Sequence, residues 1–223
     1  MNRNKCQKCG LVNLSADQAC RRCGAALSDA GDASSGLIED GKVKKRGILK
    51  RLLWIVGTTC LILLVWYASL LMSSETLGFD ERQEVYRATE ILDQRGFGKE
   101  AFAFRHLVTL RGTDNWWNRY VGHRDAYAAT NFPFEVVTLY PEFFKASTDD
   151  TERAVMLLHE AYHLYGHGEE AALEGVWREK QRVGWTEERY GHSQVWGSTK
   201  ELTRTLVPKL FICGADGRSD CLQ

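Results

Sequence analysis

The longest uninterrupted apolar run in the chain covers Leu52 to Met72, 21 residues without a charged side chain. As a helix with a rise of about 1.5 Å per residue it is about 31 Å long, which matches a bilayer hydrocarbon core of about 30 Å. Trp54 lies near one end of the run, and Trp66 and Tyr67 lie toward the other, where aromatic rings favour the membrane interface. A buried helix of a soluble protein seldom stays apolar on every side for this length. The pattern therefore predicts a transmembrane helix, which we place at 48–72.

Charge on either side of the apolar run predicts its orientation. Residues 1–51 carry 11 Lys and Arg against 5 Asp and Glu, whereas residues 73–223 carry 18 against 24. Cytoplasmic flanks of membrane helices are rich in Lys and Arg. We therefore expect a single-pass protein of a bacterial cytoplasmic membrane with a cytoplasmic N-terminus, held by an uncleaved signal-anchor, and with residues 73–223 outside the cytoplasm. That extracytoplasmic part is long enough to bury one core in one domain.

Periodic patterns within residues 73–223 predict both helices and a strand. A helix is expected from Asp80 to Gln94, because apolar or small residues recur on one face at Val85, Ala88, Thr89 and Leu92. The β-branched and aromatic run 134–140, between two prolines, predicts a strand. Further helices are expected after the capping residue Asp149 to about 165, from 169 to about 182, and from 194 to 206, and 100–110 fits either a helix or a strand. The fold class is therefore α+β.

Two matching CxxCG motifs precede the membrane run, and their cysteines are Cys6, Cys9, Cys20 and Cys23. Two such motifs form a closed tetrahedral site with four cysteine ligands, which is typical of structural zinc, and residues 5–25 resemble a short zinc ribbon. Paired disulfides are the alternative, but they do not suit a reducing cytoplasm. We place the ribbon at 1–27 and a flexible basic linker at 28–47. The lack of interleaved aromatic residues argues against nucleic acid, and leaves a protein partner or a purely structural role open.

The segment His159-Glu160-Ala161-Tyr162-His163 is an HExxH motif within a predicted helix. Spacing of i and i+4 places both imidazoles on one face, within reach of one metal ion. Glu160, one position from His159, is placed to take a proton from a zinc-bound water whose pKa the metal lowers to about 7. A catalytic zinc ion needs a third protein ligand. Our first choice is Glu170, followed by Glu169 and then His167.

The HExxH motif followed by Glu170-Ala171 resembles zincin metallopeptidases of the gluzincin-like kind. In those enzymes HExxH ends one helix, and a Glu on the following helix completes the zinc site. The likeness extends over 131–182, although the six residues between His163 and Glu170 make a shorter loop than most such enzymes have. It implies a minimal zincin-like domain at 73–223, with an edge strand beside the HExxH helix where an extended peptide can pair. The run 134–140 is the candidate for that strand.

Other residues are assigned roles by position. Tyr190 and His192 are candidate donors to the oxyanion of a tetrahedral intermediate, as a Tyr or His often is in zincins, with surface residues in a polar loop as the alternative. Trp177, Trp185 and the strand 134–140 are expected to line a substrate groove. The two C-terminal cysteines suit an extracytoplasmic disulfide, and the cysteine of the membrane run suits an apolar filler; these are Cys213, Cys221 and Cys60.

Together these patterns predict a membrane-anchored zinc metallopeptidase that hydrolyses peptide bonds of a peptide or protein substrate outside the cytoplasm. It would carry two Zn²⁺ ions, one catalytic and one structural. One alternative is a non-catalytic zincin-like membrane sensor or scaffold coupled to the cytoplasmic ribbon, and another is a structural metal site in a membrane-assembly protein. Retention of Glu160 favours the enzyme, because a non-catalytic site needs no base there. Substrate identity and oligomeric state stay open.

Overall fold

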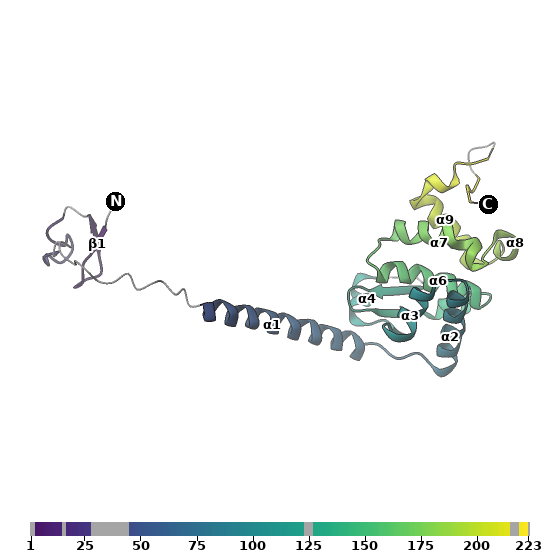
Figure 1. Ribbon diagram of the computed structural model, residues 1–223, viewed down its shortest axis with the longest axis horizontal. Coiled ribbons are helices and arrows are strands. Elements are labelled where there is room, and N and C mark those ends of the chain that lie inside the picture. Colours follow the sequence, from purple (N-terminus) through teal and green to yellow (C-terminus); the bar gives the residue numbers. More distant parts are fainter. Residues whose placement is uncertain (1–2, 15–16, 28–44, 123–126, 215–218, 223) are drawn as a thin grey trace. The chain divides into compact units, whose positions relative to one another are not determined.

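The computed structural model describes residues 3–14, 17–27, 45–122, 127–214 and 219–222 (Figure 1). The chain divides into two compact units, residues 1–55 and residues 56–223. The finer division into ribbon, linker, membrane helix and C-terminal domain stays a prediction, and most of the predicted linker lies outside the described residues.

The N-terminal unit contains a short antiparallel pair of strands, β1 (Arg3–Lys5) and β2 (Val12–Leu14), with Arg3 opposite Leu14. Each CxxCG motif forms the same tight turn. Gly10 and Gly24 both have a positive φ, of 75° and 68°, which a residue with a Cβ rarely adopts. Their backbone N–H groups donate to the carbonyl oxygens of Cys6 and Cys20. The two knuckles are therefore built alike, as their matching sequences predict.

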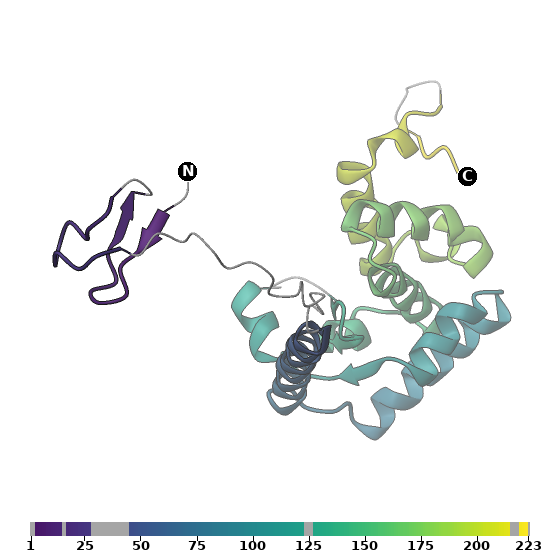
Figure 2. The ribbon, with the colours of Figure 1, turned by 60° about the vertical axis from the view of Figure 1, so that its left-hand side comes forward.

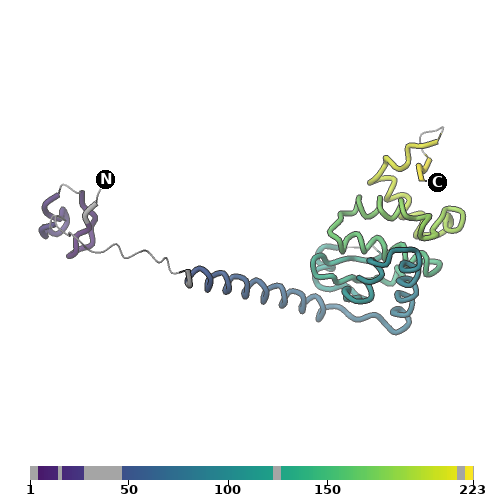
Figure 3. Tube along the Cα trace, viewed as in Figure 1, coloured from purple at the N-terminus to yellow at the C-terminus, as the bar shows by residue number. Residues whose placement is uncertain are grey.

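Helix α1 runs from Lys45 to Met72, and Figure 3 traces it without a break. Its segment Gly47–Met72 is long and apolar enough to cross a membrane, and almost all of that segment is exposed. This is the helix that the single-pass prediction requires. The cytoplasmic position of the N-terminus stays a prediction.

The C-terminal unit is mainly helical around a small mixed sheet, so the α+β prediction is confirmed. The sheet has strand order β3-β5-β4, with β3 parallel and β4 antiparallel to β5. Its strands are β3 (Thr109–Arg111), β4 (Ala128–Asn131) and β5 (Val136–Leu139). The helices after α1 are α2 (Phe79–Gln94), α3 (Gly98–His106), α4 (Trp116–Val121), α5 (Pro141–Lys145), α6 (Asp150–Leu164), α7 (Glu169–Val183), α8 (Glu187–Tyr190), α9 (Gln194–Leu206) and the 3-10 turn η1 (Pro208–Phe211).

Helix α6 lies at the centre of this unit, with α2 on one side, α7 on the other and the edge strand β4 alongside (Figure 2). Its side chains Ala154, Leu157 and Ala161 are fully buried. Asp149 caps the N-terminus of the helix, because its carboxylate accepts from the backbone N–H groups of Thr151 and Glu152. A helix held on three sides is a rigid support for the HExxH motif in its last turns.

The predicted helices agree with the structure where their patterns are regular. Helix α2 buries the four predicted positions, Val85, Ala88, Thr89 and Leu92, and α9 has the predicted bounds. The segment 100–110, which fitted either type, contains most of α3 and then the start of β3.

The strand expected at 134–140 is shorter, 136–139, and its predicted position at the sheet edge is wrong. All four residues of β5 are buried, because β5 lies between β3 and β4 and both of its faces are covered. The edge strand beside α6 is β4, in which buried residues alternate with partly exposed ones.

The C-terminal tail is closed by a disulfide and is joined to α7 by a buried lysine. Cys213 and Cys221 form the expected disulfide. Lys180 of α7 is buried and donates through Nζ to Asp220 Oδ2 at 2.6 Å and to the Leu222 carbonyl at 3.1 Å. A buried lysine requires such partners, since leaving its charge unpaired costs several kcal/mol by a rough estimate.

Candidate metal centres

The chain reverses direction directly after the HExxH motif. Helix α6 ends at Leu164, and Gly166 follows with a φ of 79°. The backbone N–H of His167 then donates to the Tyr162 carbonyl at 3.0 Å, which closes the turn. Helix α7 begins at Glu169, so its first residue lies against the last turn of α6.

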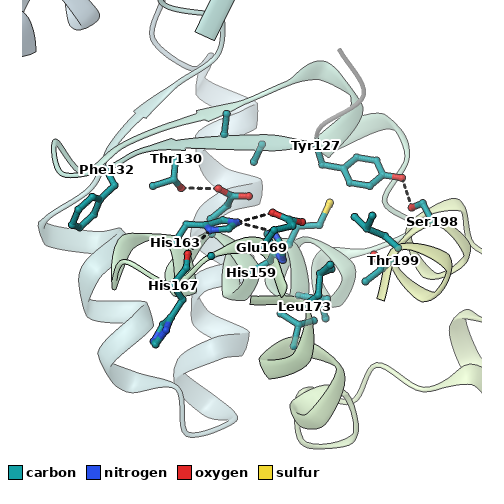
Figure 4. A pocket seen from close by; sticks show the side chains of 18 of the residues that line it. Tyr127, Thr130, Phe132, His159, His163, His167, Glu169, Leu173, Ser198 and Thr199 are labelled. Carbon is teal, nitrogen blue, oxygen red and sulfur yellow. Dashed lines mark hydrogen bonds and ion pairs between the residues drawn. The ribbon is translucent and has the colours of Figure 1, made fainter. Parts of the chain in front are cut away.

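Three side chains from these two helix ends meet at one point, His159, His163 and Glu169 (Figure 4). The Nε2 atoms of the two histidines are 3.0 Å apart, and Glu169 lies 3.1 Å from His163 Nε2 and 3.5 Å from His159 Nε2. Nitrogen and oxygen ligands about 2.0–2.2 Å from zinc in a tetrahedral site are about 3.3–3.6 Å from one another. The spacing of this HExxH centre therefore fits the donor set of a zinc ion.

The ring orientation of His163 also suits a metal ligand. Its Nδ1 lies 2.9 Å from the backbone carbonyl of His167, so Nδ1 is the nitrogen that carries the proton in the neutral ring. This leaves the Nε2 lone pair directed at the other two donors, as in most metal-binding histidines. The side chain of His167 is exposed and lies outside the cluster, so His167 contributes its carbonyl rather than its imidazole (Figure 4).

The carboxylate that the structure brings to the histidines is Glu169, our second choice, and not Glu170. Successive residues of a helix are rotated by about 100°, so only one of two neighbouring side chains at the start of α7 can face α6. The short loop after His163 sets which one it is. Glu170 is exposed. The preference for a Glu immediately before an Ala thus did not select the carboxylate that lies beside the histidines.

Electrostatics within the HExxH centre favour a cation. The carboxylate of Glu169 raises the pKa of the His163 imidazole to about 9, and the two histidines lower the pKa of the Glu169 carboxyl far below its usual range. The C-terminal end of α6, where His163 lies, carries the negative end of the helix dipole. In the absence of metal, a proton on His163 occupies the place that a metal ion would take.

Zinc affinity of this centre is expected to fall about tenfold for each pH unit below about 9, because zinc must displace the proton of His163. Glu169 stays ionised and adds no pH dependence near neutrality. The measurement is the slope of the logarithm of zinc affinity against pH. It is obtained by competition titrations against a chromophoric chelator between about pH 6 and pH 8, on the full chain and on Glu169→Gln. In the variant the pKa of His163 returns toward its usual value near 6.5, so the slope should flatten above that pH. Equal slopes in the two proteins contradict this explanation.

Glu160 faces the sheet side of the same centre. Its side chain is 5% exposed, and its Oε2 accepts from Thr130 Oγ1 of β4 at 2.6 Å. Thr130 carried no signal in the sequence, because a single threonine in a short edge strand matches no motif. It holds the Glu160 carboxylate in one orientation and leaves its second oxygen for another partner.

A cavity of about 670 Å³ opens over the HExxH centre. Strand β4 forms one wall, α6 the floor, and α7 and α9 the opposite wall (Figure 4). The part away from the histidines is apolar, whereas Tyr127 and Ser198 form a polar rim through a 2.8 Å hydrogen bond between their hydroxyls. Its apolar lining includes Ala128, Val155, Met156, Leu173, Val176 and Leu202. This volume and mainly apolar lining are typical of a ligand pocket, which measures about 300–1,000 Å³.

Tyr190 and His192 lie elsewhere, so their predicted oxyanion role is corrected. The Tyr190 hydroxyl donates to Asp149 at 2.8 Å, at the start of α6, about 15 Å along the helix from His159. His192 is exposed beside Ser193, which caps α9 and donates to the buried carboxylate of Glu152. Neither is among the described residues that line the cavity. Tyr190 stabilises the opposite end of α6 through Asp149, and His192 lies next to a residue that contacts the same end.

Trp177 and Trp185 do not line a groove either. Both are fully buried, and their rings pack against Trp196 with centroids 5.2 Å and 4.5 Å away. The Trp185 Nε1–H donates to Glu152 at 3.2 Å. These tryptophans form the core between α6, α7 and α9.

The second centre, which we call the four-cysteine centre, is formed in the N-terminal unit by Cys6, Cys9, Cys20 and Cys23. Their sulfurs lie within 4.8 Å of one another, with Cys6 3.7 Å from Cys23 and Cys9 3.4 Å from Cys20. Sulfurs about 2.3 Å from a tetrahedral zinc ion are about 3.8 Å apart. The four-cysteine centre therefore has the size of a structural zinc site.

Backbone donors favour the thiolate form of Cys20 at the four-cysteine centre. The N–H groups of Arg22 and Cys23 lower the pKa of the Cys20 thiol to about 6. Asn13, a buried residue that no motif indicated, donates through Nδ2 to Cys20 Sγ at 3.7 Å and accepts from the Arg21 N–H at 3.1 Å. Asn13 thus orients the second knuckle behind the ligands.

Comparisons of this chain with protein-family models, with curated proteins and with solved structures find no match. The likeness to zincins therefore rests on the HExxH motif itself and on the geometry of its side chains.

Proposed function

We propose that this protein is a membrane-anchored, zinc-dependent peptidase whose active site is the HExxH centre. The observation that carries the proposal is the meeting of His159, His163 and Glu169 at ligand spacing, with Glu160 beside them at the base of an open cavity. The three donors leave room for a fourth ligand from the cavity, which distinguishes a catalytic zinc site from the closed four-cysteine centre.

A zinc ion bound by these three side chains would lower the pKa of a water molecule to about 7 and polarise a substrate carbonyl. Glu160 takes a proton from the attacking water and later gives it to the leaving amine. Thr130 supports this role, because its hydrogen bond keeps the Glu160 carboxylate aimed at the cavity. The buried surroundings of Glu160 keep bulk water away from that proton.

Strand β4 supports a peptide as the substrate. It is an edge strand of the sheet, and Ala128, Ala129 and Thr130 line the cavity. An extended chain can pair with such an edge through main-chain hydrogen bonds, which brings a peptide bond to the base of the cavity. The apolar lining would receive an apolar side chain next to that bond.

The proposal includes the membrane topology that charge predicts. Helix α1 would cross the cytoplasmic membrane once, with the four-cysteine centre in the cytoplasm and the HExxH centre outside. Support comes from the apolar segment Gly47–Met72 and from the Cys213–Cys221 disulfide, which suits an oxidising compartment.

The two neighbouring glutamates of α7 provide a matched test. Full chain in detergent is expected to hold two zinc ions, and Glu169→Ala to hold one and to lose peptide hydrolysis, with an affinity loss of at least about 100-fold at the HExxH centre. Glu170→Ala removes an exposed carboxylate one residue away. It should keep both zinc ions and peptide hydrolysis. Zinc per chain after dialysis and fragment release from a peptide pool are the measurements. Loss of zinc in Glu170→Ala but not in Glu169→Ala would reverse the ligand assignment.

A further inference from the structure

Helix α4, Trp116–Val121, turns the polar side chain of Asn118 to the protein and leaves large apolar side chains exposed. Asn118 is 1% exposed, whereas Tyr120 is 80% and Val121 51% exposed, and Trp117 is also exposed. A helix on the surface of a water-soluble domain has the opposite arrangement. We call Trp117, Tyr120 and Val121 the α4 surface.

The inner side of α4 is fixed by a chain of amide hydrogen bonds. Asn115 Nδ2 donates to Asn131 at 2.7 Å, Asn131 Nδ2 donates to Asn118 at 2.8 Å, and Asn118 Nδ2 donates to Thr138 of the central strand at 3.2 Å. Asn115 also caps the helix by accepting from the Asn118 N–H. The exposed rings are therefore held outward by a buried, well-paired network.

The α4 surface is continuous with the last turns of α1. The Trp66 ring lies 6.0 Å from that of Trp116 and 5.7 Å from that of Trp117. Trp116 donates through Nε1 to Ser69 Oγ at 3.0 Å and through its backbone N–H to Ser73 Oγ at 3.1 Å. Figure 2 shows α4 as a short teal helix beside α1.

The length of α1 sets the depth of these contacts. A hydrocarbon core of about 30 Å takes about 20 residues of a helix, so a core that begins after Arg51 ends near Leu71. The positions that α4 touches, Trp66 to Ser73, then lie between about 8 Å inside the outer edge of the hydrocarbon core and just beyond that edge. Helix α4 cannot keep these contacts and stay clear of the lipid headgroups.

We propose that the α4 surface lies in the outer interface of the bilayer that α1 crosses, and forms a second membrane contact. The inference rests on the membrane-spanning part of the proposed function, and not on peptidase activity. Trp and Tyr prefer this layer because one end of each ring is apolar and the other polar. Arg119, exposed on the same helix, donates to the Ser73 carbonyl at 3.4 Å, so that a cationic side chain lies at the end of α1 where lipid phosphates are expected. Two contacts instead of one fix how the C-terminal unit is oriented on the membrane.

A label at position 120 tests this contact in the full chain. Tyr120→Cys in a Cys60→Ser background, carrying a nitrobenzoxadiazole fluorophore, is placed in phosphatidylcholine–phosphatidylglycerol vesicles. With the α4 surface about 5–10 Å into the interface, its emission should shift to the blue and lose at least about half its intensity to lipids with a nitroxide near the glycerol backbone. Tyr86→Cys, at an exposed tyrosine of α2, should show neither change.

Each other outcome has a distinct meaning. Native Cys60, labelled in the parent chain and probed with lipids that carry the nitroxide near the end of the acyl chain, reports insertion of α1, so quenching there without quenching at position 120 overturns the α4 proposal alone. A blue shift at position 120 without quenching by lipid means that a protein, such as a second copy of the chain, covers the surface, and also overturns it. No quenching at Cys60 contradicts the membrane anchor itself. Peptide hydrolysis is measured separately and does not enter this result.

Discussion

Replacement of Glu160 by glutamine is expected to lower kcat for peptide hydrolysis by about 10²–10⁴-fold while leaving both zinc ions in place. The glutamine side chain keeps the shape of the carboxylate, and its carbonyl oxygen can still accept from Thr130. It cannot accept a proton from water at neutral pH. Because Glu160 is not one of the three clustered donors, the metal content should not change. Initial rates with zinc-loaded full chain, together with zinc per chain, are the measurements.

Glu170→Gln is the matched control for this substitution, since it makes the same chemical change at an exposed position of the neighbouring helix. Its activity should equal that of the unmodified chain. Full activity in Glu160→Gln would remove Glu160 from the proposed mechanism, and loss of zinc would show that its effect is on metal binding.

Replacement of Cys20 by serine is expected to release one zinc ion and unfold the four-cysteine centre, while the HExxH centre keeps its own. The N-terminal unit has few buried side chains, among them Cys6, Cys20 and Asn13. Such a small core cannot stabilise a fold without a metal ion. Zinc binding to small Cys-liganded folds contributes about 10–16 kcal/mol, which is therefore folding free energy. Zinc per chain and the amide NMR signals of residues 3–27 measure the loss.

Cys60→Ser is the control, because it removes a thiol from α1 that is far along the chain from either centre. It should keep both zinc ions and the same NMR signals. A ribbon that stays folded without its zinc would mean that disulfides or packing, rather than the metal, hold the N-terminal unit.

The sequence predicted those helices that have a regular apolar face or a clear start or stop signal. The periodicity of 80–94, the cap at Asp149 and the proline after α9 are local signals, so α2, α6 and α9 could be placed without a structure. The four-cysteine centre is equally local, because spacing within each knuckle fixes its turn. Short elements such as β4 and α4 carry too few residues for a period to be visible.

The errors came from relations between distant residues. The choice between Glu169 and Glu170 depends on the rotation of α7 against α6, which a short loop sets and a motif does not encode. Tyr190 was assigned an oxyanion role because a Tyr or His often has it in zincins, yet Tyr190 contacts Asp149 at the other end of α6. An aromatic run such as α4 fits a buried core as well as a membrane contact, and its pairing with α1 is visible only in the structure.

Hydrolysis by the zinc-loaded full chain in water labelled with a heavy oxygen isotope tests the central claim most directly. The protein is incubated with a broad peptide pool, beside Glu160→Gln, and the products are read by mass spectrometry. The account predicts new fragments whose C-terminal carboxyl groups carry the labelled oxygen, formed by the unmodified chain and not by the variant. The absence of such fragments with zinc bound at the HExxH centre, or their equal formation by Glu160→Gln, would contradict it.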